Sequence, residues 1–452
     1  MINLLYIDLF CGAGGTSSGV EYARVDGEKC AEVIACVNHD KNAILSHQAN
    51  HPDTLHFTED IRTLELGPMM AHLAAKKAEY PEAHVVLWAS LECTNFSRAK
   101  GGQPRDADSR TLAEHLFRYI EALKPDYIQI ENVEEFMCWG DLDENGHPIS
   151  RFEGRLYLRW VKNVCSYDYN YDWRLLNAAD FGAYTSRKRF FGQFARKGLP
   201  ICFPEQTYAK YGDEGGMFRQ FKRWRPVRDV LDLADDGESI FTKKKPLCEK
   251  TLERIYAGLV KFVAGGKEQA EAWILKYNST VTTKDRISLV TTKFMDNQYG
   301  RSKPSSIDGP APTLLNNPKQ KIVSAQYLMN PYSFKSDGGS IDKPCFTLIA
   351  RMDKMPPYLI STDEGIGIKI FGDDTPMTCK IKEFMAAYGI IDIKMRMLKI
   401  AELKRIMGFP EDYTLIGTQA EQKKFIGNAV EVNMSRVLCE ALSKRLKNEK
   451  ND

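Results

Sequence analysis

A cysteine that follows a short apolar run is the first candidate for chemistry in this sequence. Cys93 stands in the stretch Ser90–Ser97, directly after the apolar run Val85–Ala89. A buried strand of an open α/β sheet ends at the carboxyl edge, where such folds place their active sites, so a thiol there is a candidate nucleophile. A lone cysteine is also a common small core residue, and the rest of the chain must decide between the two.

Two further segments carry charged side chains, and the first of them would lie at the same edge of the sheet. Glu131 and Asn132 follow the apolar run Tyr127–Ile130, which we expect to be another strand. A carboxyl group there can donate a proton if burial raises its pKa, while a thiol can add to an electron-poor ring carbon. Arg187 and Arg189 alternate along an extended stretch, so they share one face and could hold a carboxylate or a phosphate.

A glycine-rich turn near the start of the chain predicts a site for a nucleoside cofactor. The apolar run Leu4–Leu9 leads through this turn into a helix that begins near Thr16, and the glycines let a ligand approach the backbone. The second apolar run, Val33–Val37, ends where Rossmann-like folds place a side chain on a ribose. Asp60 supplies a carboxylate that can accept a hydrogen bond from an adenine amino group.

These segments favour a doubly wound α/β fold for the first 200 residues, with parallel strands and intervening helices. One such helix is expected within Thr111–Leu123, before a Lys-Pro stop signal. Beyond residue 204 the chain becomes basic and irregular. A weak repeat, Ser306–Leu314 and Ser340–Leu348, then suggests a small β-rich module. Helical spacing returns from Arg396.

The composition is that of an ordinary globular protein: 452 residues, 43% hydrophobic, with a net charge of +2. Affinity for a polyanion must therefore come from local basic clusters. Eleven cysteines without CxxC pairs, and no secretory signal or membrane-length apolar run, lead us to expect reduced thiols in the cytoplasm. His47 and His51 are four residues apart but have no clear third ligand, so no metal is expected.

Taken in order, the motifs resemble those of the cytosine-5 DNA methyltransferase family, over about the first 200 and last 57 residues. DLFCGAGG from Asp8 resembles the family's S-adenosylmethionine loop, and LECTNFS from Leu91 its catalytic PPCQxFS loop. ENV from Glu131 matches its ENV motif, and SRKRFF from Ser186 resembles its QxRxR segment. RML from Arg396 and GFP from Gly408 resemble the family's late RxLTxRE and GFP segment. IGNAV from Ile426 resembles its closing GNAV motif.

The resemblance implies a Rossmann-like class I methyltransferase fold that uses S-adenosylmethionine. Residues 1–205 would form the catalytic domain, 206–395 an inserted β-rich target-recognition domain, and 396–452 helices that return to the first domain. The implied cofactor contacts are Asp8, Phe10, Gly12, Ala13, Gly14, Gly15, Asn38, His39, Asp60, Ile61, Ser90, Asn428 and Val430. The implied catalytic residues are Cys93, Glu131, Asn132, Arg187 and Arg189, and the implied DNA contacts are Ser97, Arg98 and Lys100.

In the mechanism that the resemblance implies, the Cys93 thiolate attacks carbon 6 of a cytosine that has been flipped out of the duplex. Glu131 would bind or protonate ring nitrogen 3, so that carbon 5 becomes nucleophilic enough to take the methyl group. Asn132 would brace the Cys93 loop, and Arg187 and Arg189 would orient Glu131 and the base.

Four departures from the family pattern stand out. Leu91 and Glu92 replace the usual Pro-Pro before the cysteine, and Asn38 stands where the family more often has Glu. Thr185 takes the usual Gln place and Ala401 the usual Arg place. A carboxylate beside the thiol would raise the thiol pKa unless it points away.

Two other functions remain open from the sequence. An RNA cytosine-5 methyltransferase would share fold and cofactor, but the large middle region favours DNA. A catalytically silent DNA-binding protein would result if Glu92 had disabled the thiol. The expected partner is double-stranded DNA, with no membrane and with a cognate restriction endonuclease in the same system. We expect a monomer in the cytoplasm, encoded by a bacterium or a phage.

Overall fold

The chain forms two compact units in the computed structural model. The first comprises residues 1–230, 344–353 and 400–452, and the second comprises residues 231–343 and 354–399. The structure describes residues 2–91, 112–141, 143–144, 149–150, 153–212, 220–264, 294–297, 305–306, 320–321, 326–329, 339–346, 348, 358–364, 370–388 and 390–449. Among these residues no helix is both long and apolar enough to cross a membrane.

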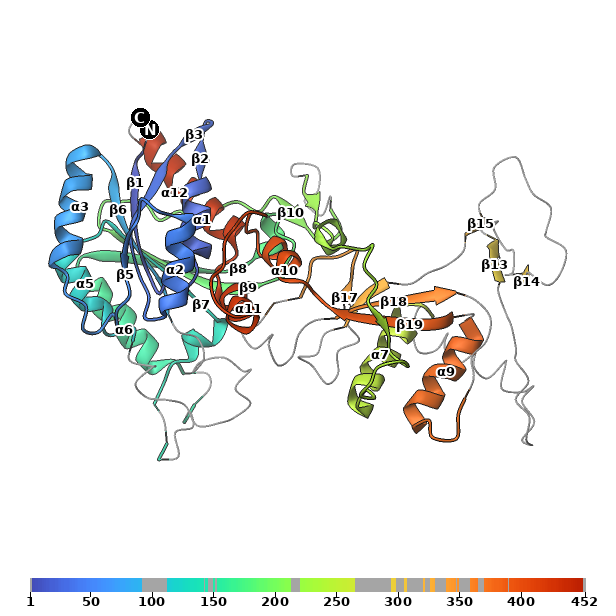
Figure 1. Ribbon diagram of the computed structural model, residues 1–452. Helices are drawn as coiled ribbons and strands as arrows, with labels where there is room; N and C mark the ends of the chain where they lie inside the picture. Colours follow the sequence, from blue (N-terminus) through green and yellow to red (C-terminus); the bar gives the residue numbers. More distant parts are fainter. Residues whose placement is uncertain are drawn as a thin grey trace. The chain divides into compact units, whose positions relative to one another are not determined.

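A seven-stranded sheet in the order β5-β4-β1-β6-β7-β9-β8 is the frame of the first unit (Figure 1). The parallel strands are β1 (Leu4–Leu9), β4 (Ala31–Val37), β5 (Leu55–Phe57), β6 (His84–Ser90) and β7 (Tyr127–Asn132). The antiparallel members are β8 (Tyr169–Asn177) and β9 (Lys188–Arg196). The predicted α/β fold with a mostly parallel sheet is therefore confirmed. The strand order reverses between β1 and β6, which is where open α/β sheets bind ligands.

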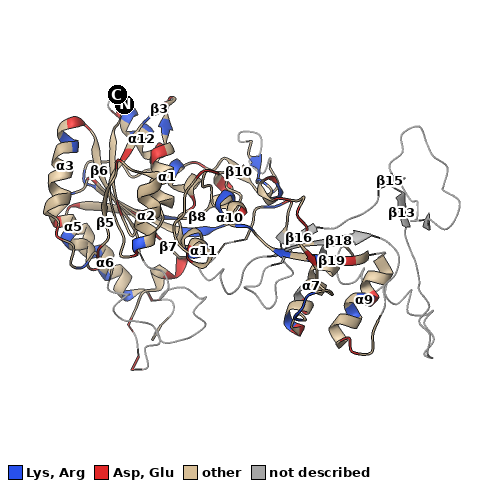
Figure 2. Ribbon diagram, in the orientation of Figure 1, with Lys and Arg blue, Asp and Glu red and all other residues tan. Residues whose placement is uncertain are grey.

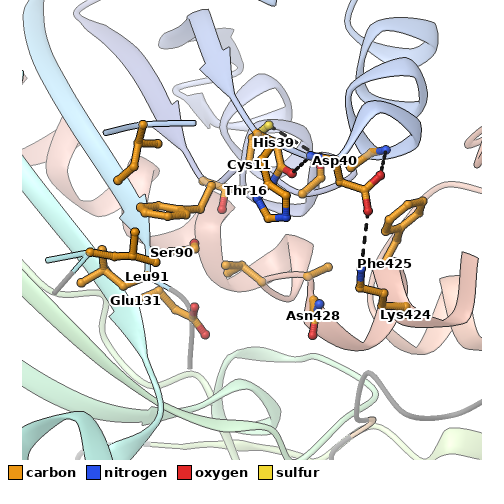
Figure 3. Close-up of a pocket in the computed structure, with 18 of the residues that line it drawn as sticks. Cys11, Thr16, His39, Asp40, Ser90, Leu91, Glu131, Lys424, Phe425 and Asn428 are labelled. Atoms are coloured by element: carbon orange, nitrogen blue, oxygen red, sulfur yellow. Dashed lines mark hydrogen bonds and ion pairs between the residues drawn. The ribbon is translucent and has the colours of Figure 1, made fainter. Parts of the chain in front are cut away.

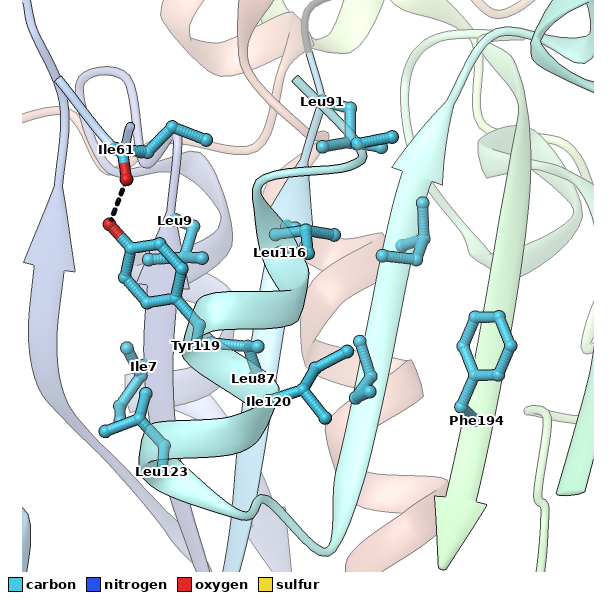
Figure 4. Packing of buried hydrophobic residues seen from close by; sticks show 14 of the residues in the cluster. Ile7, Leu9, Ile61, Leu87, Leu91, Leu116, Tyr119, Ile120, Leu123 and Phe194 are labelled. Carbon is cyan, nitrogen blue, oxygen red and sulfur yellow. Dashed lines mark hydrogen bonds between the residues drawn. The ribbon is translucent and has the colours of Figure 1, made fainter. Parts of the chain in front are cut away.

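Helices cover both faces of this sheet. On one face lie α1 (Gly15–Tyr22) and α12 (Val432–Glu449), and on the other lie α3 (Gly67–Glu79), α5 (Leu116–Leu123) and α6 (Arg155–Cys165). The alternation of side chains along β1 explains this arrangement. Leu5 and Ile7 pack in the core under α5, whereas Leu4 and Tyr6 pack in the core under α12. Figure 4 shows α5 lying on Ile7 and its neighbours, and the Tyr119 hydroxyl donating to the Ile61 carbonyl at 2.9 Å.

Shorter elements complete the first unit. They are β2 (Arg24–Val25), β3 (Glu28–Lys29), α2 (Lys41–Asn50), the 3-10 helices η2 (Glu134–Cys138), η3 (Ala178–Phe181) and η5 (Val227–Val230), β10 (Tyr208–Ala209), β11 (Lys222–Arg223), α10 (Ile400–Ile406) and α11 (Gln419–Asn428).

The second unit contains an antiparallel sheet in the order β12-β19-β18-β16-β17. Its strands are β12 (Glu238–Ser239), β16 (Gln326–Met329), β17 (Gly339–Ser340), β18 (Tyr358–Glu364) and β19 (Ile390–Met397), and a smaller sheet joins β13 (Phe294–Asn297), β14 (Ser305–Ser306) and β15 (Gln320–Lys321). The helices α7 (Glu249–Phe262) and α9 (Pro376–Tyr388) share one core with the larger sheet.

The sequence predicted helical structure from Arg396, and this prediction is wrong. Arg396 lies in β19, and the first following helix begins at Ile400. The reason is the spacing of the apolar residues before it: Ile393 and Met395, two positions apart, both pack in the core of the second unit. Of the repeat, Ser340–Phe346 is described, whereas the first copy beyond Ser306 lies outside the described residues.

The contact between α1 and α12 predicts a large effect of a single methyl group. A Cβ atom on Gly19 would lie 2.0 Å from Ser435 Oγ and 2.3 Å from the Val432 carbonyl oxygen, both in α12. Gly19→Ala should therefore lower the free energy of unfolding by about 1–3 kcal/mol, measured by chemical denaturation. Gly67→Ala is the matched control, because a Cβ there meets no atom within 4 Å. An unchanged stability of the Gly19 variant would contradict the close contact.

Candidate active site

A cavity of about 510 Å³ opens at the carboxyl ends of β1, β4, β6 and β7 (Figure 3). Its volume is in the range of small-molecule sites. The predicted cofactor contacts that line it are Phe10, Gly12, Asn38, His39, Asp60, Ile61, Ser90, Asn428 and Val430. The predicted catalytic residues that line it are Glu131, Arg187 and Arg189. The structure thus gathers into one cavity residues that are spread over most of the chain.

Other predicted cofactor contacts shape the glycine-rich turn without lining the cavity. These are Asp8, Ala13, Gly14 and Gly15. A Cβ on Gly14 would lie 2.4 Å from the Tyr413 hydroxyl oxygen, and one on Gly15 would lie 2.4 Å from the Val430 carbonyl oxygen. Gly14 also has a φ of 98°, which favours glycine. Because these two glycines have no side chain, the carboxyl-terminal segment can pack directly against the turn.

Asp8 is fully buried, and burial raises the pKa of its carboxyl group well above the usual range. The hydrogen bond from Ser17 Oγ to its Oδ2, at 2.8 Å, acts in the opposite direction. The side chain of Asp8 thus holds the start of α1 against the end of β1.

The polar groups of the cavity suit an adenosyl ligand. The Arg62 guanidinium donates to both carboxylate oxygens of Asp60 at 2.6–3.0 Å and lowers the Asp60 pKa, so this side chain is an ionised acceptor suited to an amino group. Asn38 Oδ1 accepts from the Asp40 N–H at 2.9 Å. Asn38 therefore offers amide hydrogens where the family more often has a carboxylate, while Phe10 and Ile61 provide apolar surface for a ring.

One wall of the cavity comes from α11, near the end of the chain. Lys424, Phe425 and Asn428 line it, and Lys424 Nζ lies 3.5 Å from Asp40 Oδ2 (Figure 3). Nearby, Asn42 Nδ2 donates to Glu421 Oε1 at 3.0 Å. Asn428 was predicted from the sequence, whereas Lys424 and Phe425 were not. Helical spacing of three and four residues back from Asn428 would have found them.

Glu131 lies buried at the end of β7, between two guanidinium groups. Its Oε1 is 3.4 Å from Arg189 Nε and 4.0 Å from Arg187 Nη2. Arg187 is buried as well, and its Nη1 also donates to the carbonyl oxygens of Gly427 and Leu348 at 3.2 and 3.3 Å. A buried carboxyl group is thus held in position by cations that are themselves anchored to the backbone.

Asn132 lies outside the cavity lining and ties β7 to the segment after β6. Its Nδ2 donates to the Leu91 carbonyl at 3.2 Å, and its Oδ1 accepts from the Val133 N–H at 2.8 Å. Leu91 is the last described residue before residues 92–111. The predictions for Glu92, Cys93, Ser97, Arg98 and Lys100 lie outside the described residues.

Thr185, where the family usually has Gln, packs against a segment from the middle of the chain. It forms a parallel bridge with Cys345, whose carbonyl accepts from the Ser186 N–H at 2.8 Å. The end of the second repeat copy therefore belongs to the first unit. It pairs with Thr185 and Ser186, the two residues that precede Arg187.

A comparison with known proteins shows the family to which the chain belongs. The family model described as C-5 cytosine-specific DNA methylase matches residues 4–444. The chain belongs to that family. The family-level predictions, a cytosine-5 DNA methyltransferase with S-adenosylmethionine as its cofactor and DNA as its partner, are therefore confirmed.

Curated relatives agree with this assignment, and a solved structure shares the fold. The type II methyltransferase M.NlaIV of Neisseria lactamica is 22% identical over 98% of this chain and 99% of its own length. The type II methyltransferase M.XorII of Xanthomonas oryzae is 29% identical over 44% of this chain, which corresponds to 43% of that relative. The methyltransferase EhMeth of Entamoeba histolytica shares the fold, with a TM-score of 0.50 at 14% identity over 99% of both chains.

The buried carboxyl group of Glu431, the residue after Val430, leads us to expect that the free energy of unfolding depends on pH. Burial raises the pKa of its carboxyl group to about 7, although its Oε2 accepts from the Met434 N–H at 2.8 Å. An acid whose pKa is raised by folding stabilises the folded state at low pH and loses this contribution as the pH rises through 7. The difference in unfolding free energy between Glu431→Gln and the parent should therefore grow by roughly 2–3 kcal/mol from pH 5 to pH 8.

This difference can be measured by chemical denaturation at the two pH values, with Glu65→Gln as the control because Glu65 is exposed. The control should show the same pH dependence as the parent. A Glu431 variant that loses stability as steeply as the parent would rule out this carboxyl group as the cause.

Proposed function

We propose that this chain transfers the methyl group of S-adenosylmethionine to carbon 5 of cytosine in double-stranded DNA, through a covalent bond to Cys93. The observation that carries the proposal is the position of Glu131. Its buried carboxyl group lies at one end of a cavity whose other walls hold the predicted cofactor contacts. An acid and an adenosyl site in one cavity suit alkylation of a ring that must first be activated.

In this proposal Cys93 is the nucleophile. It follows Leu91 by two residues, and the bond from Asn132 to the Leu91 carbonyl supports a braced starting point for its loop. The thiolate forms a bond to carbon 6 of the cytosine, and carbon 5 then becomes electron-rich. S-adenosylmethionine supplies the methyl group as an electrophile when it is bound. Loss of the carbon 5 proton to a base then breaks the bond between carbon 6 and sulfur.

Glu131 acts at ring nitrogen 3, where a hydrogen bond or proton draws electron density from carbon 6 and favours the thiol attack. Arg187 and Arg189 hold the Glu131 carboxyl group in position through the contacts at 4.0 and 3.4 Å. Because both guanidinium groups are largely buried, their charges are weakly screened, and their placement costs little reorganisation when the base arrives.

The remaining roles follow from the same reaction. A cytosine in a duplex must be flipped out, and Ser97, Arg98 and Lys100 are the residues that we assign to phosphate contacts beside the nucleophile. Residues 206–395, which include most of the second unit, would recognise the target sequence. The cytoplasm, where the DNA of a bacterium or phage is accessible, is the proposed location.

The biological role that we propose is modification of DNA within a restriction-modification system. It is supported by the relatives M.NlaIV and M.XorII, which are both described as type II methyltransferases. A cognate restriction endonuclease would then be the functional partner, and the chain would act on DNA as a monomer.

Cys93→Ser should abolish methyl transfer, because a serine hydroxyl is a far weaker nucleophile towards carbon 6. Bisulfite sequencing of DNA from cells that express the parent should reveal one reproducible methylated sequence context, and the variant should show none. Binding of S-adenosylmethionine, measured by calorimetry, should stay close to that of the parent. Cys202→Ser is the control, since Cys202 lies outside the cavity, and it should methylate normally. Methylation by the Cys93 variant, or transfer to tRNA in place of DNA, would overturn the proposal.

Glu131→Gln should reduce turnover by about 10²–10⁴-fold, the usual contribution of a positioned acid, while DNA binding is retained. Transfer of a radiolabelled methyl group and a gel-shift assay measure the two quantities. Glu134→Gln is the matched control, because this exposed carboxylate lies three residues away and pairs with Lys188 at 3.5 Å. Unchanged turnover of the Glu131 variant would remove this carboxyl group from the mechanism.

A further inference from the structure

Two thiols and two imidazoles meet beside the cofactor cavity. Cys11 lies in the glycine-rich turn, Cys36 in β4, His47 in α2 and His56 in β5. The sulfur atoms of Cys11 and Cys36 and one ring nitrogen of His47 all lie within 4.8 Å of one another, and the three residues are buried. Nδ1 of His47 lies 2.9 Å from Nε2 of His56.

The hydrogen bonds of His47 orient its ring. Ser17 Oγ donates to Asp8 Oδ2 at 2.8 Å, so its lone pairs are available to His47 Nε2, which lies 2.8 Å away. Nε2 therefore carries the proton and donates to Ser17, and Nδ1 presents its lone pair towards His56. An imidazole that binds a metal usually donates its other ring N–H to a carboxylate, a backbone carbonyl or water, and here the Ser17 hydroxyl group takes that place.

The distances within the group of Cys11, Cys36 and His47, and the distance from His47 to His56, suit a tetrahedral ion. Zinc binds imidazole nitrogen at about 2.0–2.1 Å and thiolate sulfur at about 2.3 Å, which places two nitrogens about 3.3 Å apart and two sulfurs about 3.8 Å apart. The nitrogens of His47 and His56 need to separate by only a few tenths of an ångström from 2.9 Å. The sulfurs of Cys11 and Cys36 and one nitrogen of His47 lie within 4.8 Å of one another, a limit that includes the value required of the sulfurs. His56 joins these three side chains through its contact with His47.

His51, which lies four residues after His47, has a different environment. Nε2 of His51 lies 3.1 Å from Ser18 Oγ and 3.4 Å from the Tyr413 hydroxyl oxygen. His51 thus joins α2 to α1 and to the carboxyl-terminal segment, while His47 meets the thiols. No metal was expected because no third ligand could be seen near the two histidines in the sequence; Cys11 and Cys36 come from other parts of the chain.

We propose that Cys11, Cys36, His47 and His56 bind one zinc ion. Two thiolates and two imidazoles form a donor set that zinc occupies in structural sites, and four protein ligands leave no open position for catalysis. The ion would fix the turn that carries Phe10 and Gly12 to β4, α2 and β5. Its role is therefore to hold one wall of the cofactor cavity, and the site does not depend on the chemistry assigned to Cys93.

The metal content of the purified chain tests this proposal. The full chain, produced in zinc-supplemented medium and purified with a phosphine reductant, should contain one equivalent of zinc by elemental mass spectrometry. Cys36→Ser should lose most of it. Cys202→Ser is the control, because Cys202 is a half-buried thiol that lies outside this cluster, and it should keep one equivalent.

Cobalt substitution keeps the test informative if the Cys36 variant fails to fold. Added to the zinc-free parent chain, Co²⁺ should give a thiolate charge-transfer band in the near ultraviolet and the strong visible bands of a tetrahedral ion. His56→Gln, a change at a partly exposed ligand, should weaken the binding of Co²⁺ by at least tenfold. No zinc in the parent, no charge-transfer band, or a Cys11–Cys36 disulfide in its place would overturn the proposal.

Discussion

The carboxyl-terminal segment can form a wall of the cavity because α1 lets α12 approach it closely. Gly15 and Gly19 lie on the side of α1 where a Cβ atom would be 2.4 Å and 2.0 Å from atoms of Val430 and Ser435. Only residues without a side chain fit there. This contact places α11 so that Phe425 and its neighbours face the glycine-rich turn, and a cavity between segments more than 400 residues apart results.

A second contact, between Arg187 and α11, joins the two ends of the cavity. Arg187, which lies 4.0 Å from the Glu131 carboxyl group, donates to the Gly427 carbonyl at the end of α11. The cation beside the acid is therefore anchored by the helix that lines the cofactor side. Such an arrangement keeps a buried charge in place through backbone dipoles, and it links the cation beside the acid to α11.

Much of this architecture could be predicted from the sequence, because buried parallel strands and their carboxyl ends leave a local pattern. The strand before Glu131 and the turn after Asp8 are examples. Contacts that depend on sheet order leave no such pattern. The meeting of Cys11 with His47 requires β1 and β4 to be neighbours, and the pairing of Thr185 with Cys345 joins residues 160 apart. Arg396 was placed in a helix because the helical spacing of the residues after it was extended back over a segment whose apolar side chains recur every two residues.

In the proposed mechanism, Cys93 adds to cytosine in the cavity that contains Glu131. Trapping tests it most directly: the full chain is incubated with S-adenosylmethionine and long DNA in which 5-fluorocytosine replaces every cytosine, so that each sequence context is present. We expect a covalent complex that requires the cofactor, with the DNA attached to Cys93 when the peptides are mapped by mass spectrometry. Absence of a complex, or attachment at another residue, would contradict it.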